Sequence, residues 1–145
     1  MNKRELDFRR DLLDQMSGLW YPTIHVENHL SPGVPDLSFV LIAKGFETGW
    51  MELKSVIKAA DVFVEASQHR WFERHCQYIP TCFLIDVNGT VFVVPGARHA
   101  RLISVTNDKL VDNSTHRFLR EGLAHELRPI LMSITRVSNR AFTTA

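Results

Sequence analysis

Residues 33–54 read GVPDLSFVLIAKGFETGWMELK, and this stretch gives the strongest indication of the fold. A loop rich in proline and glycine leads to Asp36, and the apolar run after it predicts a strand over 36–43. The polar residues that follow predict a turn, and GWMELKS predicts a short strand over 49–55. We expect these two strands to pair as a hairpin because the connection between them is short.

The strand over 49–55 carries two opposite charges close together. Side chains alternate between the two faces of a strand, so Glu52 and Lys54 are expected on one face together with Trp50. Met51 and Leu53 are then expected on the opposite face. Burying either charge without a partner is costly. Considered alone, the pair fits an internal ion pair and a functional site equally well.

The apolar periodicity on either side of this hairpin predicts the remaining elements. An Asn-Gly pair between two apolar runs predicts a second hairpin, and Pro129 is expected to interrupt the last helix. We therefore predict an α/β fold with the order α-βββ-α-ββ-α: a helix over 3–16, strands over 21–28, 36–43 and 49–55, a helix over 61–78, strands over 81–87 and 90–95 around Asn88-Gly89, a further short strand over 101–105, and a closing helix over 114–132 with a loose tail.

Composition fits a small globular protein. The 145 residues are 45% hydrophobic, without repeats or flexible linkers, which predicts a single domain over 1–145. No apolar run reaches the roughly 18 positions of a membrane span, and the charged N-terminus lacks an apolar signal segment, so we expect a soluble cytoplasmic protein without a membrane partner. Its two cysteines are then expected to be reduced. A net charge of +1 neither favours nor excludes a nucleic-acid partner.

Asp36 makes a functional site the better explanation of the charged strand. It begins the neighbouring strand directly after the loop, so its carboxylate and that of Glu52 are expected to meet at an open edge of the sheet. Two carboxylates offer the hard oxygen ligands that Mg²⁺ prefers, and this ion also binds phosphate oxygens. Lys54 could then orient a water molecule or neutralise charge on a phosphate.

These motifs together resemble those of the PD-(D/E)XK nuclease superfamily. The chain has GVPD at 33–36, WMELK at 50–54 after thirteen intervening residues, and Gln68 and Trp71 on the next predicted helix. The resemblance is closest to virus-type replication-repair nucleases (VRR-NUC) and to phage nucleases similar to Holliday-junction resolvases. It covers about residues 3–95, leaving 96–135 as a C-terminal strand and helix extension. It implies a restriction-endonuclease-like core (α-βββ-α-β) with a central mixed sheet flanked by helices.

The resemblance also implies roles for individual residues. Asp36, Glu52 and the backbone carbonyl of Leu53 are implied to bind Mg²⁺ or Mn²⁺. Lys54 is implied to be catalytic, and Gln68 to line the catalytic site.

The family has a further acidic residue upstream of the PD pair, and two residues of this chain compete for that place. Glu27 is slightly favoured because it is near the loop in sequence. Glu5 stays an alternative because it falls on the apolar stripe of the first predicted helix, where a carboxylate needs a partner such as Arg9 or a task.

The expected function is that of a metal-dependent endodeoxyribonuclease that hydrolyses DNA phosphodiester bonds. The resemblance implies selectivity for branched or junction DNA and a homodimer, because two cuts across a junction need two sites related by a twofold axis. The alternative is a non-catalytic DNA- or protein-binding module that has kept the fold.

Other polar residues allow weaker predictions. A zinc site is not expected, because the seven histidines lack the usual close Cys/His spacings. Trp71 is expected to pack in the core rather than to stack on a base. Four histidines near the site in sequence could shuttle a proton, although a surface or half-buried imidazole is the favoured interpretation: His25, His29, His69 and His75. Further side chains could contact DNA phosphates or could equally be ordinary solvated charges: Lys58, Arg70, Arg74, Arg98, His99 and Arg101.

Overall fold

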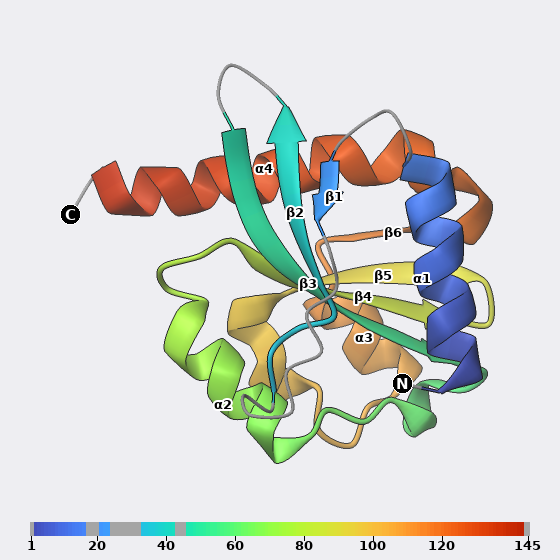
Figure 1. Cartoon of the computed structure of the whole chain (residues 1–145). Helices are drawn as coiled ribbons and strands as arrows, with labels where there is room; N and C mark the ends of the chain where they lie inside the picture. Colours follow the sequence, from blue (N-terminus) through green and yellow to red (C-terminus); the bar gives the residue numbers. More distant parts are fainter. Residues whose placement is uncertain (1, 17–20, 24–32, 43–45, 144–145) are drawn as a thin grey trace.

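The computed structural model describes residues 2–16, 21–23, 33–42 and 46–143 (Figure 1). Within these residues, one sheet contains six strands in the order β1-β2-β3-β4-β5-β6. Neighbouring strands are antiparallel, except that β3 and β4 are parallel. The strands are β1 (Tyr21–Thr23), β2 (Leu37–Ile42), β3 (Phe46–Val56), β4 (Thr81–Val87), β5 (Thr90–Pro95) and β6 (His116–Leu119).

Helices cover both faces of this sheet (Figure 1). The α-helices are α1 (Lys3–Met16), α2 (Ala66–His75), α3 (Asn107–Asn113) and α4 (Leu123–Thr143), and the short 3-10 helices are η1 (Ala59–Asp61), η2 (Gly96–Arg101) and η3 (Arg120–Gly122). The predicted α/β class, with a mixed sheet between helices, is confirmed. In the described part of the chain, every helix is too short or too polar to span a membrane.

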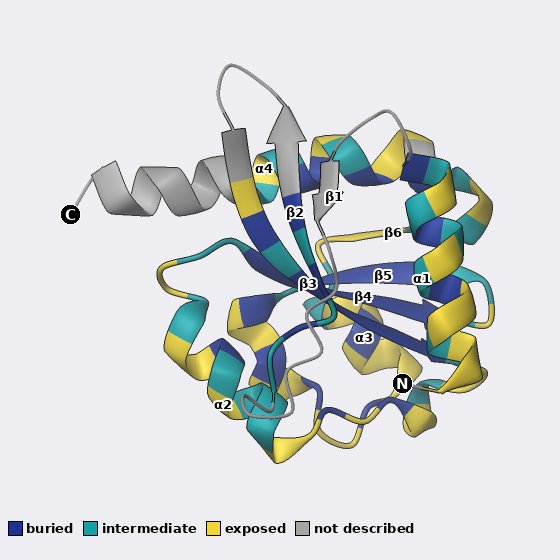
Figure 2. Cartoon of the chain, viewed as in Figure 1, coloured by how far each residue is buried: buried dark blue, intermediate teal, exposed yellow. Residues whose placement is uncertain are grey.

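Two apolar clusters hold the layers together, one on each face of the sheet. On one face, α1 and α4 contribute Phe8, Leu12, Leu127 and Leu131, which pack with Leu53 and other strand residues. On the other face, α2 and α3 pack against the sheet through a second cluster whose members include Phe72, Phe83, Ile85, Phe92 and Leu110. Buried residues therefore gather along β3, β4 and β5 in the middle of the molecule (Figure 2).

Both predicted hairpins are present. Ile42 pairs with Phe46 in the antiparallel register of β2 and β3, while the turn residues between them lie outside the described residues. At the second hairpin, Asn88 and Gly89 have φ angles of 49° and 96°, the left-handed values that a tight turn of this kind requires. Of the strand predicted over 21–28, β1 occupies 21–23, and the rest lies outside the described residues.

The predicted helix over 61–78 begins later, at Ala66, and ends at His75. Val62 and Val64 are both buried, but they belong to an extended segment rather than to a helical face. The helix starts where it does because Glu65 and Gln68 form a capping box, in which each side chain bonds the other residue's backbone N–H.

The segment after β5 differs most from prediction. No strand forms over 101–105, because η2 ends at Arg101, and Leu102 and Val105 instead turn into the core. The helix predicted to begin at Ser114 begins at Leu123, and the residues before it form β6, which pairs with β5. The expected loose tail is also wrong. The backbone of α4 stays helical through Pro129 and on to Thr143, although proline removes one backbone donor.

Candidate active site

The site lies where β2 ends beside β3 and leaves one edge of β3 open. β3 pairs with β2 over Phe46 to Met51 and with β4 over Trp50 to Val56, so beyond Met51 β4 is its only partner among the described strands. The Leu53 N–H points to the open edge and donates to Asp36 Oδ2 over 2.9 Å. Because the N–H and C=O of one strand residue face the same neighbouring strand, the Leu53 carbonyl also points to this edge.

The alternation predicted for β3 is confirmed. Met51 and Leu53 belong to the cluster under α1 and α4, whereas Trp50 contacts Trp71 of α2 on the other side of the sheet. Glu52 and Lys54 share that second face and bond a side chain of α2. The two charged side chains therefore lie under the N-terminal turn of α2.

Glu52 is buried, with 3% of its surface exposed, but both of its carboxylate oxygens have partners. Oε2 accepts the backbone N–H of Asp36 over 3.1 Å. Oε1 accepts Gln68 Nε2 over 2.7 Å and lies 3.5 Å from Lys54 Nζ. The Glu52 carboxylate thus accepts from the backbone N–H of Asp36, and the Asp36 carboxylate accepts from the backbone N–H of Leu53, the residue after Glu52.

Gln68 connects the acid, the base and the start of α2. Its Oε1 accepts from Lys54 Nζ over 3.1 Å and from the Glu65 backbone N–H over 2.9 Å, while its Nε2 donates to Glu52. The capping box that starts α2 therefore also fixes the amide between Glu52 and Lys54. Lys54 itself is 8% exposed.

The loop that delivers Asp36 is pressed against the same helix. Gly33 has φ of +92°, and a Cβ at this position would lie 2.2 Å from the backbone oxygen of Ser67. Glycine lets the loop approach the backbone of α2 at the residue before Gln68. This contact places the loop end, Asp36, beside the first turn of α2.

Electrostatics make the ionised form of Glu52 unfavourable in the metal-free protein. Burial raises the pKa of Glu52 well above its ordinary value, and the negative charge of Asp36 raises it further, against a smaller lowering by Lys54. A cation placed between the two carboxylates would reverse this balance.

Glu5, one of the two candidates for the upstream acid, lies in the described part of the chain. Burial raises its pKa, the charge of Lys54 lowers it and that of Asp36 raises it. It sits in the first turn of α1. Glu27, the competing residue, lies outside the described residues.

These groups fit a hard divalent cation that keeps part of its water shell. Asp36 and Glu52 supply carboxylate oxygens, the Leu53 carbonyl faces the same edge, and Glu5 is nearby. Among the residues that the structure describes, no three His, Cys, Asp or Glu side chains are close enough to form a ready-made metal cluster. Mg²⁺ needs no such cage, because it usually binds one or two carboxylates and retains several waters.

The predicted phosphate-contacting residues are mostly exposed. Lys58, Arg70, Arg74 and Arg101 are at the surface, as is Arg98, whose guanidinium donates to the Asn113 carbonyl over 2.8 Å.

His99 differs from that group. It is buried and bonds the Glu73 carboxylate and the His69 ring, so it is not placed to meet a phosphate on the surface. Sequence reasoning missed this chain of three side chains. Only the spacing of His69 and Glu73, one helical turn apart, was visible in the sequence, and nothing in it pointed to His99.

Trp71 is partly buried and packs against the apolar cluster under α2, as expected from its helical face. Its ring meets Trp50 edge-on at 6.1 Å and Phe72 at 5.2 Å, and it stacks on His75 at 4.3 Å between centroids. His75 Nδ1 also bonds the Trp71 carbonyl over 2.7 Å. Both residues thus have packing roles on the flank of α2.

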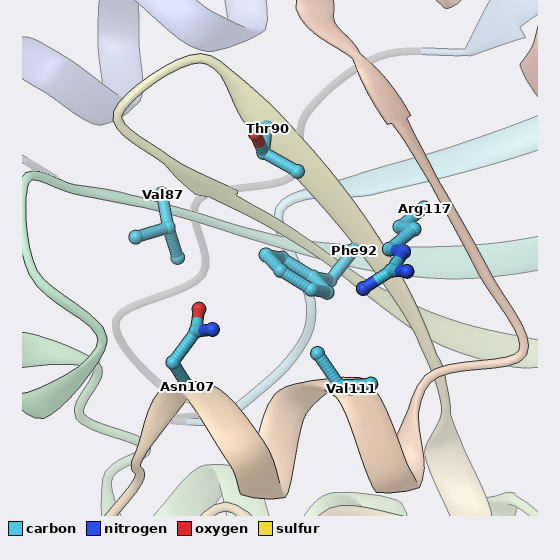
Figure 3. A pocket seen from close by; sticks show the side chains of 6 residues that line it. All are labelled: Val87, Thr90, Phe92, Asn107, Val111 and Arg117. Atoms are coloured by element: carbon cyan, nitrogen blue, oxygen red, sulfur yellow. The ribbon is translucent and has the colours of Figure 1, made fainter.

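A separate hollow of about 320 Å³ lies between the β4–β5 hairpin and α3 (Figure 3). Phe92 forms part of its wall, and the Arg117 guanidinium points into it (Figure 3). Its other lining residues are Val87, Thr90, Asn107 and Val111. Among the described residues, no carboxylate lines this hollow, so the described lining offers no acidic ligand for a divalent cation.

No protein-family model matches the chain, and neither a curated protein nor a solved structure matches it. Any functional assignment therefore rests on the motifs and on the geometry of the site.

Proposed function

We propose that this protein is a metal-dependent endodeoxyribonuclease of the PD-(D/E)XK type. The observation that carries the proposal is the meeting of Asp36, Glu52 and Lys54 at the open edge of β3, with Gln68 bonded to both members of the Glu52–Lys54 pair. These are the residues that the motif resemblance implies for catalysis. They come from three separate stretches of the chain, and their convergence does not follow from the spacing of any one motif.

The order of elements also supports a restriction-endonuclease-like core. From α1 through β4 the chain follows the order α-βββ-α-β, with β1, β2 and β3 antiparallel and β4 added parallel to β3. The first helix packs on one face of this core, and α2 packs on the other.

In the proposed reaction, Asp36, Glu52 and the Leu53 carbonyl would hold Mg²⁺ or Mn²⁺, with Glu27 or Glu5 as the fourth group from the chain. When bound, this ion activates water for attack and stabilises charge on the scissile phosphate. Lys54 orients the attacking water and offsets the negative charge that builds on the phosphate. Gln68 keeps the ammonium and the Glu52 carboxylate in fixed positions.

The test is a plasmid-nicking assay with Mg²⁺, with EDTA and with a Glu52→Ala variant. Cleavage should require the metal and should fall by at least about 100-fold in the variant, because a carboxylate ligand of the metal is lost. Glu121→Ala is a matched control, since this carboxylate is exposed on η3, away from the site. Metal-independent cleavage, or equal activity of the two variants, would contradict the proposal.

One observation favours a second candidate, a binding module without activity. Glu52 and Lys54 are both buried and satisfy each other internally through Gln68, as a purely structural ion pair would. Such a module would bind DNA or a protein, and the nicking assay would then show no cleavage with any metal.

For the nuclease, selectivity for branched DNA and action as a homodimer are the favoured subtype. A cleavage panel of four-way junctions, flaps, single strands and duplexes at matched salt tests the selectivity, because phosphate contacts make affinity salt-dependent. Sedimentation of the protein with and without a junction tests the dimer.

A further inference from the structure

A chain of three hydrogen-bonded side chains lies beside the proposed site. His69 and Glu73 are one turn apart on α2, and His99 of η2 bonds both of them. The two histidine Nδ1 atoms are 3.0 Å apart, and His99 Nε2 is 2.8 Å from Glu73 Oε2. His99 is 8% exposed, whereas the Glu73 side chain is 73% exposed. The chain thus runs from solvent, through a buried imidazole, to His69.

His69 is next to the reactive groups. It directly follows Gln68, which bonds both Glu52 and Lys54. Burial lowers the pKa of His69, and the charges of His99 and Lys54 lower it further. Among the described residues, no hydrogen bond reaches His69 Nε2, the ring nitrogen that the bond to His99 leaves over.

Counting hydrogen-bond donors allows two arrangements of the hydrogens along these three side chains. A carboxylate only accepts, so His99 Nε2 carries a hydrogen. When His99 is neutral, its Nδ1 is a lone pair, so His69 donates from Nδ1 and presents a lone pair at Nε2. When His99 holds one more proton, it donates from both nitrogens, and neutral His69 accepts at Nδ1 and carries its hydrogen at Nε2. One proton added to His99 therefore turns Nε2 of His69 from an acceptor into a donor.

The surroundings determine where that extra proton is held. The Glu73 carboxylate favours positive charge on His99, from a distance of 2.8 Å. Lys54 and burial both disfavour positive charge on His69. Whenever His99 donates from both of its nitrogens, the hydrogen that can be passed on lies at Nε2 of His69.

We propose that His69 donates a proton from Nε2 to the oxygen that leaves the cleaved phosphate, and that His99 and Glu73 supply this proton and fix the ring. The inference rests on the nuclease function proposed above. His69 is then a catalytic residue, and His99 and Glu73 are positioning residues. The mechanism needs such a donor, because an alkoxide is a poor leaving group.

The step balances within the chain. As the oxygen of the attacking water, which gives up a proton to solvent, bonds to phosphorus, the bond from phosphorus to the leaving oxygen breaks. The electron pair of the broken bond stays on the leaving oxygen, which takes the hydrogen of His69 Nε2. His69 Nδ1 takes the Nδ1 hydrogen of His99, which becomes neutral. Afterwards Nε2 takes a proton from water, and the Nδ1 hydrogen returns to His99.

The test compares ordinary DNA with DNA that has sulfur in place of the leaving oxygen at one linkage, chosen after the product ends have been mapped. A thiolate leaves without protonation, because thiols are far stronger acids than alcohols. His69→Asn keeps an amide near the Nδ1 position but has no group where Nε2 lies. We expect this variant to lower kcat on ordinary DNA by about 100-fold and to change cleavage at the sulfur linkage little.

His75→Asn is the matched control on the same helix. His75 bonds the Trp71 carbonyl and takes no part in the chain of three. It should leave both rates unchanged, and the melting temperatures of both variants report on folding.

A pH profile tests the positioning role of Glu73. The charged groups that face the two rings are Lys54 from β3 and Glu73 from α2 itself. Glu73→Gln removes the carboxylate, so the extra proton is lost at lower pH, and the alkaline limb of kcat should move to lower pH. This shift should appear on ordinary DNA and not at the sulfur linkage.

The outcomes separate the two proposals. If the wild-type protein cleaves DNA but His69→Asn slows both linkages equally or neither of them, the proton-donor role is overturned and the nuclease function stands. An unshifted profile for Glu73→Gln would overturn the positioning role. If the wild-type protein cleaves no DNA with any metal, both proposals fail.

Discussion

At the scale of single residues, Glu52 has an environment that opposes its negative charge. Burial raises its pKa well above the ordinary value, the Asp36 carboxylate raises it further, and the nearby Lys54 ammonium compensates only in part. A structural carboxylate would normally be placed where its charge is favoured. Glu52 is instead placed where a bound cation would be required to make its charge favourable.

This environment predicts that the melting temperatures of the wild-type protein and of Glu52→Gln differ by an amount that depends on pH. Because the folded pKa lies above the ordinary value of 4.5, the proton on Glu52 stabilises the fold. This contribution is complete below that value and is lost as the pH rises through the folded pKa. In EDTA, the melting temperature of the wild-type protein should therefore fall relative to that of Glu52→Gln as the pH rises from about 4 to 8.

Added Mg²⁺ should raise the melting temperature of the wild-type protein and leave that of Glu52→Gln nearly unchanged, because the amide in the variant cannot replace the Glu52 carboxylate as a ligand. Glu121→Gln, an exposed site, should follow the wild-type protein at every pH. A difference between wild type and Glu52→Gln that is constant with pH would show that burial does not hold the proton on Glu52.

At the scale of elements, the contact between the loop before β2 and the first turn of α2 assembles the site. The loop carries Asp36, the helix carries Gln68, and Gly33 allows their backbones to touch at Ser67. A side chain at position 33 meets two separate obstacles, the positive φ of +92° and the Ser67 backbone oxygen at 2.2 Å. The loop and the helix would have to move apart to admit it.

Gly33→Ala should therefore lower both stability and activity. We expect a loss of about 1–3 kcal/mol from backbone strain alone and a further loss from the clash, measured by urea denaturation. Cleavage should fall at least about 100-fold, because a shift near 1 Å at a catalytic group is enough for that.

Gly89→Ala provides the matched control for backbone strain. Gly89 has φ of +96°, but a Cβ there would meet nothing within 4 Å. It should lose stability by strain alone and keep its activity. Equal activity of the two variants would show that the loop contact does not position Asp36.

Much of this arrangement could be predicted from local sequence, because the deciding interactions are local. The alternation of side chains in β3 places Glu52 and Leu53 on opposite faces of the sheet. Asn88-Gly89 determines the β4–β5 hairpin by backbone conformation alone. The segment over 114–122 was predicted as helix because its apolar residues have helical spacing. β6 forms there instead, since backbone pairing with β5 over His116–Leu119 outweighs that weak local preference.

In the site, too, contacts within one hairpin could be predicted, whereas contacts between distant segments could not. Asp36 directly precedes β2, and Glu52 follows the β2-paired part of β3 in the same hairpin, so their approach could be predicted. The bond from Gln68 to both charges depends on where α2 begins, and the predicted start was five residues too early, at 61 instead of 66. The place of His99 beside His69 depends on how η2 packs against α2, which no periodicity in the sequence encodes.

At the scale of the whole molecule, one buried polar network links four segments distant in sequence. Asp86 of β4 is fully buried and accepts from Ser55 Oγ of β3 over 2.7 Å and from the Gly89 N–H over 2.8 Å. Arg120, at the start of η3, donates to Asp86 over 3.1 Å and to Asp11 of α1 over 2.8 Å. This network lies at the C-terminal end of β4 and uses none of the proposed catalytic side chains.

Arg120→Ala should therefore destabilise the fold without impairing the chemistry. Asp86 would keep two donors but lose its cationic partner, and the packing of the guanidinium over the Phe8 ring, at 5.1 Å, would also be lost. The expected loss is about 1–3 kcal/mol in the free energy of unfolding, with kcat on DNA unchanged below the melting transition. Arg10→Ala is the control, because the Arg10 side chain is 75% exposed and lies 3.9 Å from Asp7, an exposed pair that contributes at most about 1 kcal/mol. If the two variants lost equal stability, the Arg120 network would be no stronger than a surface ion pair, and packing of α1 and α4 on the sheet would have to hold these segments together by itself.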